Sequence, residues 1–438
     1  MQRRAVITGV GCVTPLGATT DAVWHGLTAG RSAVGRLTLF DADKFPVKIA
    51  AEVRNWDIGD VGEDVRHWKH SPRQTVFAVG AALKAMRDSA LDERRIDPTR
   101  FGVYLGCGEP FEDFFQFADS VQGTRHPSVL NQDDSPDGAL RLFDPDAERE
   151  YEPNAAASHI AGLCNAQGPN ANCIAACVSS SQAIGNAART IRRGDADLML
   201  CGGAHSTIHP FGLTGFQRLS ALSTRDGDPS AAVRPFDRER DGFVVGEGAA
   251  VFILEELEHA RRRNAHVWGE VTGFGSSQDA FRVTDTHPDG RGTTTSILRA
   301  IRDARLNVDD IDYINAHGTG TVLNDKIETL AIKQALGSHA YDVPISSSKS
   351  MLGHATTACG AIELAVCLMT LRWRVVPPTI NYSTPDPDCD LDYTPNVARE
   401  SKNCRHVLSN SIGFGGQNAA LVVSRFDEAS SFAIRRAA

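Results

Sequence analysis

Short runs of apolar residues recur along the chain at the length of buried β-strands. They occupy residues 5–10, 101–105, 198–201, 249–254, 311–315 and 419–423. A continuous apolar run of this length is typical of a strand covered on both faces, because a half-exposed strand would alternate apolar and polar positions. The pattern therefore predicts a largely buried sheet between layers of helices.

Helical periodicity is found between these runs in two well-marked segments. Residues 180–193 place apolar side chains on one face, carry arginines toward the end and stop at Gly194, which is typical of an amphipathic helix. Residues 360–372 are apolar nearly all round, which predicts an interior helix that is too short to cross a membrane. Both helices follow a turn of small and polar residues, so we hypothesise that the chain contains two similar halves.

The overall composition is that of an ordinary folded protein with an acidic balance. Of the 438 residues, 42% are hydrophobic and 23% are charged, and the formal net charge is -9. A nucleic-acid-binding surface needs a basic excess, so nucleic acid is not an expected partner. The chain enters the run at residues 5–10 without the apolar stretch of a signal peptide, and we expect a cytoplasmic protein without membrane contact.

The cysteines point to chemistry at one position. Most of the ten lie inside apolar runs, and none has the C-x-x-C spacing of a structural zinc site, so we expect buried thiols and no metal. Cys177 lies between a β-like run, residues 172–176, and the helix that begins near Ser179. The free N–H groups at a helix start can stabilise a thiolate, which makes Cys177 a candidate nucleophile. A buried inert thiol is the alternative, and it is the commoner state of a single cysteine.

Two histidines and a glycine-rich turn accompany this cysteine along the chain. His317 ends the apolar run that begins at residue 311, and His354 lies at the start of the second helix, five residues after Lys349. The turn at residues 412–416, which contains Phe414, could bring backbone N–H groups close to a substrate because glycine has no Cβ. Taken singly, either histidine is more often structural, and the turn is an ordinary hairpin with a core phenylalanine.

Together these segments resemble a known family. The sequence is similar to the β-ketoacyl-[acyl-carrier-protein] synthases, most closely the elongating type II enzymes of fatty-acid synthesis and the related polyketide ketosynthases. The resemblance extends from Arg4 to about Arg425. Its motifs are residues 6–11 (VITGVG), the Cys177 segment, 194–197 (GDAD), 234–237 (RPFD), 246–248 (GEG), 315–321 (NAHGTGT), 349–354 (KSMLGH) and 409–416 (SNSIGFGG).

The resemblance implies an α/β fold, namely a thiolase-like five-layered α-β-α-β-α sandwich of two pseudo-symmetric halves. We expect residues 1–258 to form the N-terminal half, which carries the nucleophile, and residues 259–425 to form the C-terminal half, which carries both histidines. Residues 426–438 are expected to be a loose tail. By the same resemblance, the protein is a homodimer whose second subunit helps to line the acyl pocket.

The resemblance also implies a reaction. Cys177 would take a primer acyl group from the phosphopantetheine arm of an acyl carrier protein and condense it with a malonyl carrier, with loss of carbon dioxide, to give a 3-oxoacyl product. His317 and His354 would stabilise the enolate that forms in the second step. The other implied roles are oxyanion donors at Cys177 and Phe414 with Phe414 also a gate, supporting charges on Lys349, Glu363 and Glu328, and pantetheine binding by Thr319, Thr321 and Phe216.

Acyl carrier protein is the expected partner, and no cofactor is expected because both substrates arrive on the carrier. An acyl carrier protein is acidic, so Arg66, Lys69 and Arg73 form a candidate docking patch. A solvated basic face is the alternative interpretation of these three residues.

Several segments depart from the usual family pattern. They are residues 178–182, residues 355–359 and an acidic, Phe-rich insertion over residues 107–152, which we expect to be an irregular surface excursion. A type II polyketide, aryl-polyene or unusual lipid pathway therefore stays open, with thiolases and chalcone-type synthases ranked behind it. From other classes, Cys177 argues against a non-catalytic partner like the chain-length factors. A dinucleotide-binding loop at residues 9–11 lacks its third glycine.

Overall fold

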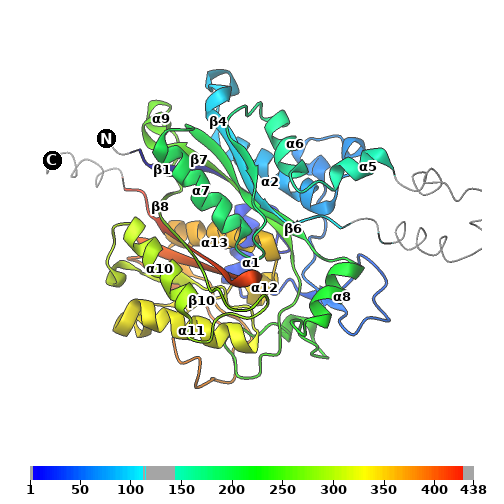
Figure 1. The fold of residues 1–438 in the computed structure, drawn as a ribbon, viewed down its shortest axis with the longest axis vertical. Helices are drawn as coiled ribbons and strands as arrows, with labels where there is room; N and C mark the ends of the chain where they lie inside the picture. The colour runs from blue at the N-terminus through cyan, green and yellow to red at the C-terminus, as the bar shows by residue number, and fades with distance from the viewer. Residues whose placement is uncertain (1–2, 112–113, 115–143, 428–438) are drawn as a thin grey trace, which may run out of the picture.

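The computed structural model describes residues 3–111, 114 and 144–427 (Figure 1). Ten strands form one continuous sheet in the order β10-β9-β13-β14-β8-β1-β7-β6-β4-β5. Those of the first half are β1 (Ala5–Val13), β4 (Phe101–Cys107), β5 (Asn170–Asn172), β6 (Leu198–Ser206) and β7 (Glu247–Glu256). Those of the second half are β8 (Gly269–Gln278), β9 (Tyr313–Asn315), β10 (Ile345–Ser346), β13 (His406–Gly413) and β14 (Gln417–Ser424). Two small sheets pair β2 (Gly35–Arg36) with β3 (Ile49–Ala50) and β11 (Val375–Val376) with β12 (Arg399–Glu400).

The large sheet consists of two halves with the same topology. Renumbered within each half, the strands follow the order 3-2-4-5-1, as β5-β4-β6-β7-β1 and as β10-β9-β13-β14-β8. The pairing is also the same, because the first three strands of each list are parallel and the last two join antiparallel. Within the sheet, the two halves are joined by the pairing of β1 with β8, at Val6 with Glu270 and Ile7 with Gly269. The hypothesis of two similar halves is confirmed.

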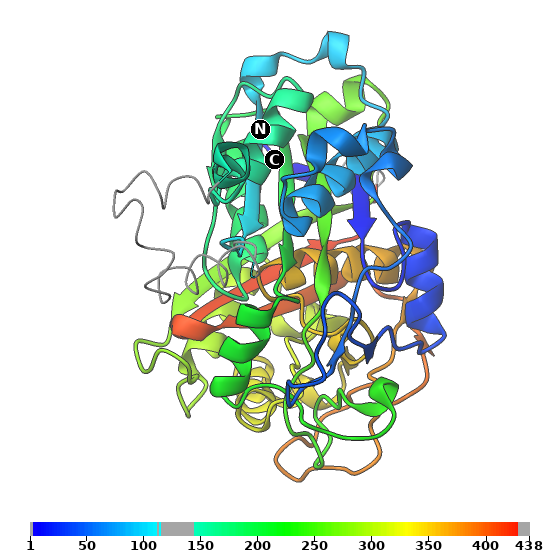
Figure 2. The ribbon, with the colours of Figure 1, turned by 90° about the vertical axis from the view of Figure 1, so that its right-hand side faces the viewer.

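Helices cover both halves and fill the space between them. α7 (Ser179–Arg193) and α13 (Cys359–Trp373) contact each other and strands of both halves, so they form the middle layer (Figure 1). α2 (Arg73–Ser89) and α6 (Ala155–Leu163) cover the outer face of the first half. α10 (Arg291–Asp303) packs on the outer face of the second half, with α11 (Val322–Leu336) beside it. The result is the predicted five-layered sandwich, and Figure 2 shows it from the side.

Glycines allow the outer helices to approach the sheet at matching places in the two halves. A Cβ atom on Gly11 of β1 would lie 1.9 Å from the carbonyl oxygen of Ala81 in α2. A Cβ atom on Gly275 of β8 would lie 2.1 Å from the carbonyl oxygen of Ser296 in α10. The glycines at the start of the chain therefore serve helix packing inside a strand. They do not form a phosphate-binding loop, and the dinucleotide interpretation is wrong.

The predicted elements agree with the structure in the interior and differ at their ends. All six apolar runs lie wholly or partly in strands, and both predicted helices are present within one residue of their expected bounds. α13 is buried from Cys359 to Leu371, as its apolar pattern predicts. The prediction of a β-strand over residues 172–176 is wrong, because β5 ends at Asn172. Within residues 3–111 and 144–427, the remaining α-helices are α1 (Thr20–Thr28), α5 (Pro145–Glu150), α8 (Pro210–Arg218), α9 (Leu257–Arg262) and α12 (Lys349–Leu352).

Two predicted irregular segments are described only in part. In the insertion at residues 107–152, residues 112–113 and 115–143 lie outside the described residues. The remainder is not wholly irregular, because Cys107 closes β4 and residues 145–150 form α5. Of the expected tail at residues 426–438, residues 428–438 also lie outside the described residues.

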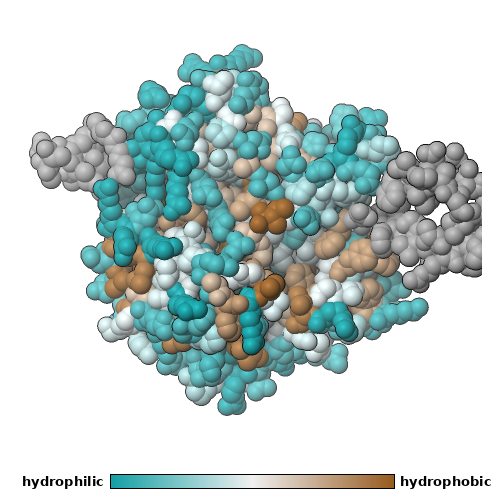
Figure 3. All heavy atoms as spheres, viewed as in Figure 1, coloured by the Kyte–Doolittle hydropathy of each residue, from teal (hydrophilic) through white to brown (hydrophobic). Residues whose placement is uncertain are grey.

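The surface seen in Figure 3 is mainly hydrophilic, with hydrophobic side chains in small separate groups. One group lies over α8, whose Phe211 is 37% exposed. Among the residues that the structure describes, no helix combines the length and the apolar character needed to cross a membrane.

Candidate active site

Cys177 occupies a tight turn between β5 and the first residue of α7. The preceding residue, Ala176, has a φ of 47°, a left-handed conformation that is uncommon for a residue with a side chain. The Cys177 side chain is buried, and its Sγ atom lies 3.2 Å from Nε2 of His354. The turn therefore aims the thiol at a group that can exchange a proton with it.

The thiol is held in its neutral form by its surroundings. Burial raises the pKa of Cys177 to about 11, while the ammonium group of Lys349 and the backbone N–H groups of Phe414 and Cys177 act in the opposite direction. These two N–H groups reach the sulfur atom, so they are placed beside any acyl carbonyl attached to it. They can act as the donors that stabilise an oxyanion at that carbon.

His317 and His354 lie together against the cysteine from two different turns. Their ring centroids are 5.3 Å apart and the rings are nearly perpendicular, at 83°. Burial, followed by the charge of Lys349, lowers the pKa of each well below 6.5. Both imidazoles are therefore neutral at pH 7, and each can donate one ring N–H.

Backbone contacts fix both histidines. The N–H of His354 donates to the carbonyl oxygen of Val244 at 2.8 Å, and the edge of the Phe243 ring packs on the imidazole at 5.0 Å. His354 lies between α12 and α13 rather than at a helix start, which corrects the expectation from the sequence. The N–H groups of His317 and Gly318 both donate to the carboxylate of Glu328, each at 2.8 Å. Glu328 thus determines the path of the turn that carries His317.

A buried ion pair joins the short helix α12 to the longer helix α13, on either side of His354 in the chain. Lys349 of α12 bonds to Glu363 of α13, and each side chain is only 2% exposed. Burial raises the pKa of Glu363 to about 7, opposed by Lys349. Burial acts to lower the pKa of the Lys349 ammonium, but the attraction of Glu363 and further contacts act in the opposite direction, and the pKa is raised overall. The positive charge near both histidines is therefore maintained.

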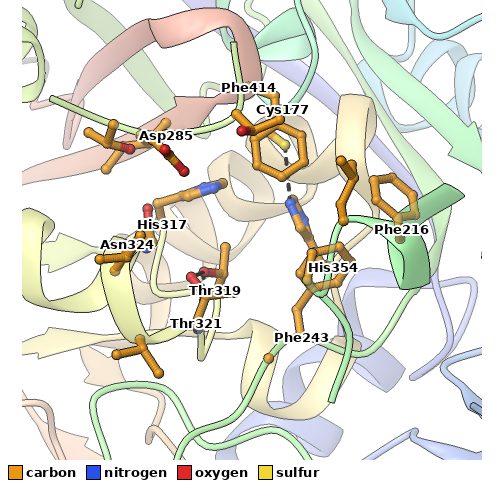
Figure 4. A pocket seen from close by; sticks show the side chains of 18 of the residues that line it. Cys177, Phe216, Phe243, Asp285, His317, Thr319, Thr321, Asn324, His354 and Phe414 are labelled. Carbon is orange, nitrogen blue, oxygen red and sulfur yellow. Dashed lines mark hydrogen bonds between the residues drawn. The ribbon is translucent and has the colours of Figure 1, made fainter. Parts of the chain in front are cut away.

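Cys177, His317 and His354 line a cavity of about 270 Å³ that is open to solvent (Figure 4). Thr319 and Thr321 stand at its wall with their Oγ1 atoms 2.9 Å apart. Phe216 of α8 and Phe414 of the glycine-rich turn also face the cavity. In the view of Figure 4, Phe414 lies beside Cys177, Phe216 and His354 lie on one side, and Asp285, His317 and Asn324 lie on the other. Every predicted catalytic and pantetheine-binding residue except Lys349 therefore meets at one pocket, and Lys349 acts from behind it.

Comparisons with known proteins identify the family. The models for the N-terminal and the C-terminal domain of β-ketoacyl synthases match residues 2–260 and residues 268–383. The chain belongs to the β-ketoacyl synthase family. It is 42% identical to the tetracenomycin polyketide synthase ketoacyl synthase alpha subunit of Streptomyces glaucescens, over 98% of this chain and 99% of that protein. It is 41% identical to 3-oxoacyl-[acyl-carrier-protein] synthase 2 of Coxiella burnetii, over 97% and 99%.

Solved structures of ketosynthases share the fold. One is a type II polyketide ketosynthase bound to a hexaketide and in complex with its acyl carrier protein, which matches with a TM-score of 0.86 and 34% identity, over 98% of this chain and 100% of that one. The thiolase-like architecture inferred from the sequence is confirmed by this neighbour and by the strand order of the two halves.

Some residues of this β-ketoacyl synthase pocket carried no signal in the sequence. Phe243 packs on His354, and Asp241 and Asp285 line the cavity. Cys359, at the start of α13, donates its thiol to the carbonyl oxygen of Cys177 at 3.2 Å. These residues lie in loops or in apolar runs that match no motif or helical periodicity. Only their positions in the folded structure identify them.

The expected docking residues Arg66, Lys69 and Arg73 are all exposed. Arg66 lies within the short 3₁₀ segment Val65–Trp68 and pairs with Asp64, and Lys69 follows this segment directly. Arg73 binds the fully buried carboxylate of Glu247 through two nitrogens. The docking patch stays a prediction, with two of its three charges already paired inside the chain.

Two sets of side chains have the spacing of metal ligands within the described residues. Cys177, His317 and His354 form one set, and His317, Cys359 and Glu363 form the other, with ligand atoms within 4.8 Å of one another in each. Both sets share His317, and the first contains Cys177, the predicted nucleophile. A metal ion bound at the first set would block the thiol, so the two uses of these side chains exclude each other. The expectation that no metal is bound stays a prediction.

Proposed function

We propose that this protein catalyses the decarboxylative condensation of an acyl group, held on Cys177, with malonyl-[acyl-carrier protein] to give a 3-oxoacyl-[acyl-carrier protein]. The observation that supports it most strongly is the contact of 3.2 Å between the Cys177 thiol and His354, with the neutral His317 beside them in one pocket. A nucleophile next to two neutral N–H donors matches a reaction with an acyl-enzyme step and an enolate step.

In the first step, the Cys177 sulfur attacks the thioester carbonyl of the acyl carrier. The N–H groups of Cys177 and Phe414 stabilise the oxyanion, the bond from that carbon to the carrier sulfur breaks, and the proton of the Cys177 thiol passes to the leaving thiol. The contact with His354 provides the route for this proton. A thiol whose pKa is raised to about 11 needs such a partner, because little thiolate exists at pH 7.

In the second step, malonyl carrier loses carbon dioxide, and the electrons of the broken bond form an enolate on its thioester. His317 and His354 donate their N–H groups to the enolate oxygen. The enolate carbon then attacks the acyl carbonyl on Cys177, the carbon–sulfur bond breaks, and the sulfur takes up a proton. Neutral imidazoles suit this role, because burial keeps the pKa of both well below 6.5.

The remaining residues support these steps in the proposal. Thr319, Thr321 and Phe216 contact the pantetheine arm, and Phe414 gates the acyl site. Glu328 positions His317 through its two backbone hydrogen bonds. Lys349 and Glu363 place a positive charge behind both histidines.

We further propose that an acyl carrier protein docks near Arg66 and Lys69, and that the enzyme works as a homodimer without a cofactor. Arg66 and Lys69 are exposed and complement an acidic partner. The proposed location is the cytoplasm, since all ten cysteines are free, as expected in a reducing compartment.

A type II polyketide pathway is the second candidate. It is favoured by the 42% identity to the tetracenomycin subunit and by the likeness to a ketosynthase that holds a hexaketide. Fatty-acid synthesis is favoured by 41% identity to a 3-oxoacyl synthase over nearly the whole chain. The two candidates share the chemistry and differ in the primer and the number of extensions.

One experiment tests the function and ranks the primers. The protein is mixed with acyl carrier proteins that carry short, long or unsaturated chains, and the acylated peptide is identified by mass spectrometry. We expect acylation at Cys177, none in Cys177→Ser, and release of carbon dioxide with a 3-oxoacyl product when malonyl carrier is added. If Cys177 accepts no acyl group from any carrier, a non-catalytic partner role replaces the proposed one.

A further inference from the structure

Charged side chains are unevenly placed around the active-site pocket. Among its lining residues, the carboxylates are Asp241 and Asp285, and there is no lysine or arginine. Thr319, Thr321 and Asn324 provide the neutral polar part of the wall. This part of the wall, away from the two histidines, therefore suits the neutral amide and hydroxyl groups of a ligand better than an anionic group.

An arginine stands at the edge of this pocket, held by one of the two carboxylates. Nη1 of Arg282 lies 3.1 Å from Oδ2 of Asp285. The guanidinium also lies over the ring of Phe281, 5.1 Å from its centroid. The Arg282 side chain is 68% exposed, against 32% for the pocket-lining Asp285, so most of the guanidinium is open to solvent. An arginine fixed from below by a carboxylate and an aromatic ring is preorganised to bind a second anion from outside.

The loop that carries Arg282 is hydrogen-bonded to the glycine-rich turn at residues 412–416 and to the strand that follows it. The buried carboxylate of Asp279 accepts hydrogen bonds from Asn418 at 2.8 Å and from the backbone N–H of His287 at 3.0 Å. The backbone N–H of Gly415 donates to the carbonyl oxygen of Val283 at 2.5 Å. The loop at residues 279–287 is therefore held against the glycine-rich turn that contains Phe414.

A second arginine at the mouth is less available. Arg225 lies 4.0 Å from Asp241 and donates to the carbonyl oxygen of Glu239, and its side chain is 30% exposed. Arg282 is closer to its carboxylate, more exposed and stacked on a ring, so it is the better candidate for an external anion.

We propose that Arg282 binds the phosphodiester of the phosphopantetheine arm at the pocket mouth, with Asp285 as the residue that positions it. The inference rests on the proposed function, in which acyl groups arrive on this arm. The arm combines a neutral part, with two amides and a hydroxyl, and one anionic phosphate. The neutral part matches the threonine-lined interior, while Asp241 and Asp285 keep the phosphate outside, where Arg282 meets it.

The test compares three acyl donors with wild-type protein and with Arg282→Ala. Acyl-[acyl-carrier protein] has both the phosphate and a protein surface, acyl-4′-phosphopantetheine has the phosphate alone, and acyl-pantetheine has neither. The second-order rate constant for acylation of Cys177 is measured by quenched mass spectrometry. Arg95→Ala is the matched control, because Arg95 is also an exposed arginine in an i,i+3 pair with an aspartate, Asp92, away from the pocket.

We expect Arg282→Ala to slow acylation about tenfold with both phosphate-bearing donors and to leave acyl-pantetheine unchanged. Arg282→Lys should retain part of the rate, and Asp285→Asn should cause a smaller loss that is also confined to phosphate-bearing donors. An equal loss with acyl-pantetheine, or no loss with acyl-4′-phosphopantetheine, would overturn the proposal. A loss with the carrier alone would also overturn it and assign Arg282 to carboxylates of the carrier protein. Failure of the proposed function itself is recognised separately, because wild-type Cys177 would then accept no donor.

Discussion

The Sγ atom of Cys177 lies 3.2 Å from Nε2 of His354, although 177 positions separate the two residues in the chain. Each comes from the turn that precedes a helix of the middle layer, α7 for the cysteine and α13 for the histidine. The two halves of the molecule therefore supply the thiol and the imidazole from corresponding places. In the proposed reaction, acyl transfer depends on how these halves pack.

The two histidines should have separable roles. His354→Ala should slow both acylation of Cys177 and release of carbon dioxide, because His354 contacts the thiol. His317→Ala should spare acylation and slow carbon dioxide release by ~100-fold or more, the usual cost of losing one oxyanion donor. Acylation is measured by mass spectrometry and carbon dioxide by trapping. His205→Gln serves as a control, since His205 is buried outside the pocket lining. Equal losses in both steps for His317→Ala would contradict the assignment.

Removing one partner of the ion pair between Lys349 and Glu363 should destabilise the fold more than replacing both partners by apolar residues. Lys349→Met leaves a buried carboxylate without its partner and should lower the free energy of unfolding by about 3–5 kcal/mol. The double variant Lys349→Met with Glu363→Leu should be more stable than that single variant, because no unpaired charge remains. Urea unfolding measures both. A double variant less stable than the single would show that the unpaired Glu363 carboxylate does not cause the loss.

Acid should destabilise the protein through its buried histidines. Burial lowers the pKa of His205 to about 4 and keeps those of His317 and His354 well below 6.5. As pH falls below about 6.5, the unfolded chain binds protons that the native state does not, so the free energy of unfolding decreases by up to ~1.4 kcal/mol per pH unit for each histidine. Urea unfolding between pH 7 and pH 5 tests this. His205→Gln should reduce the slope by about one histidine's share, and an unchanged slope would show that His205 is already protonated or plays no part.

Matched glycine substitutions should separate packing from chain flexibility. Gly11→Ala and Gly275→Ala each place a Cβ atom within about 2 Å of a helix carbonyl, at 1.9 Å and 2.1 Å, and should lower the melting temperature sharply. Gly162→Ala, in α6, meets no atom within 4 Å and should be neutral or stabilising by about 0.5–1 kcal/mol. Similar losses at all three positions would mean that close packing of the outer helices is not the cause.

Much of the fold could be predicted from local pattern alone. The run at residues 5–10 became β1, and residues 360–372 became the interior helix α13, because burial on all sides requires apolar residues at every position. Element ends were harder, as at β5, which stops at Asn172 where backbone pairing ends although the apolar run continues. The division at residues 258 and 259 stays a prediction.

By itself, the sequence determined the family and the middle helices, and it singled out Cys177, the two histidines and the glycine-rich turn as candidates, since each is encoded within a few adjacent residues. Only the tertiary structure decided which atoms meet. Glu328 reaches the backbone of His317 from α11, and Asp285 enters the pocket from a loop with no distinguishing pattern. Such contacts depend on the packing of two halves around α7 and α13, and a packed interior fixes distances that no local run of residues contains.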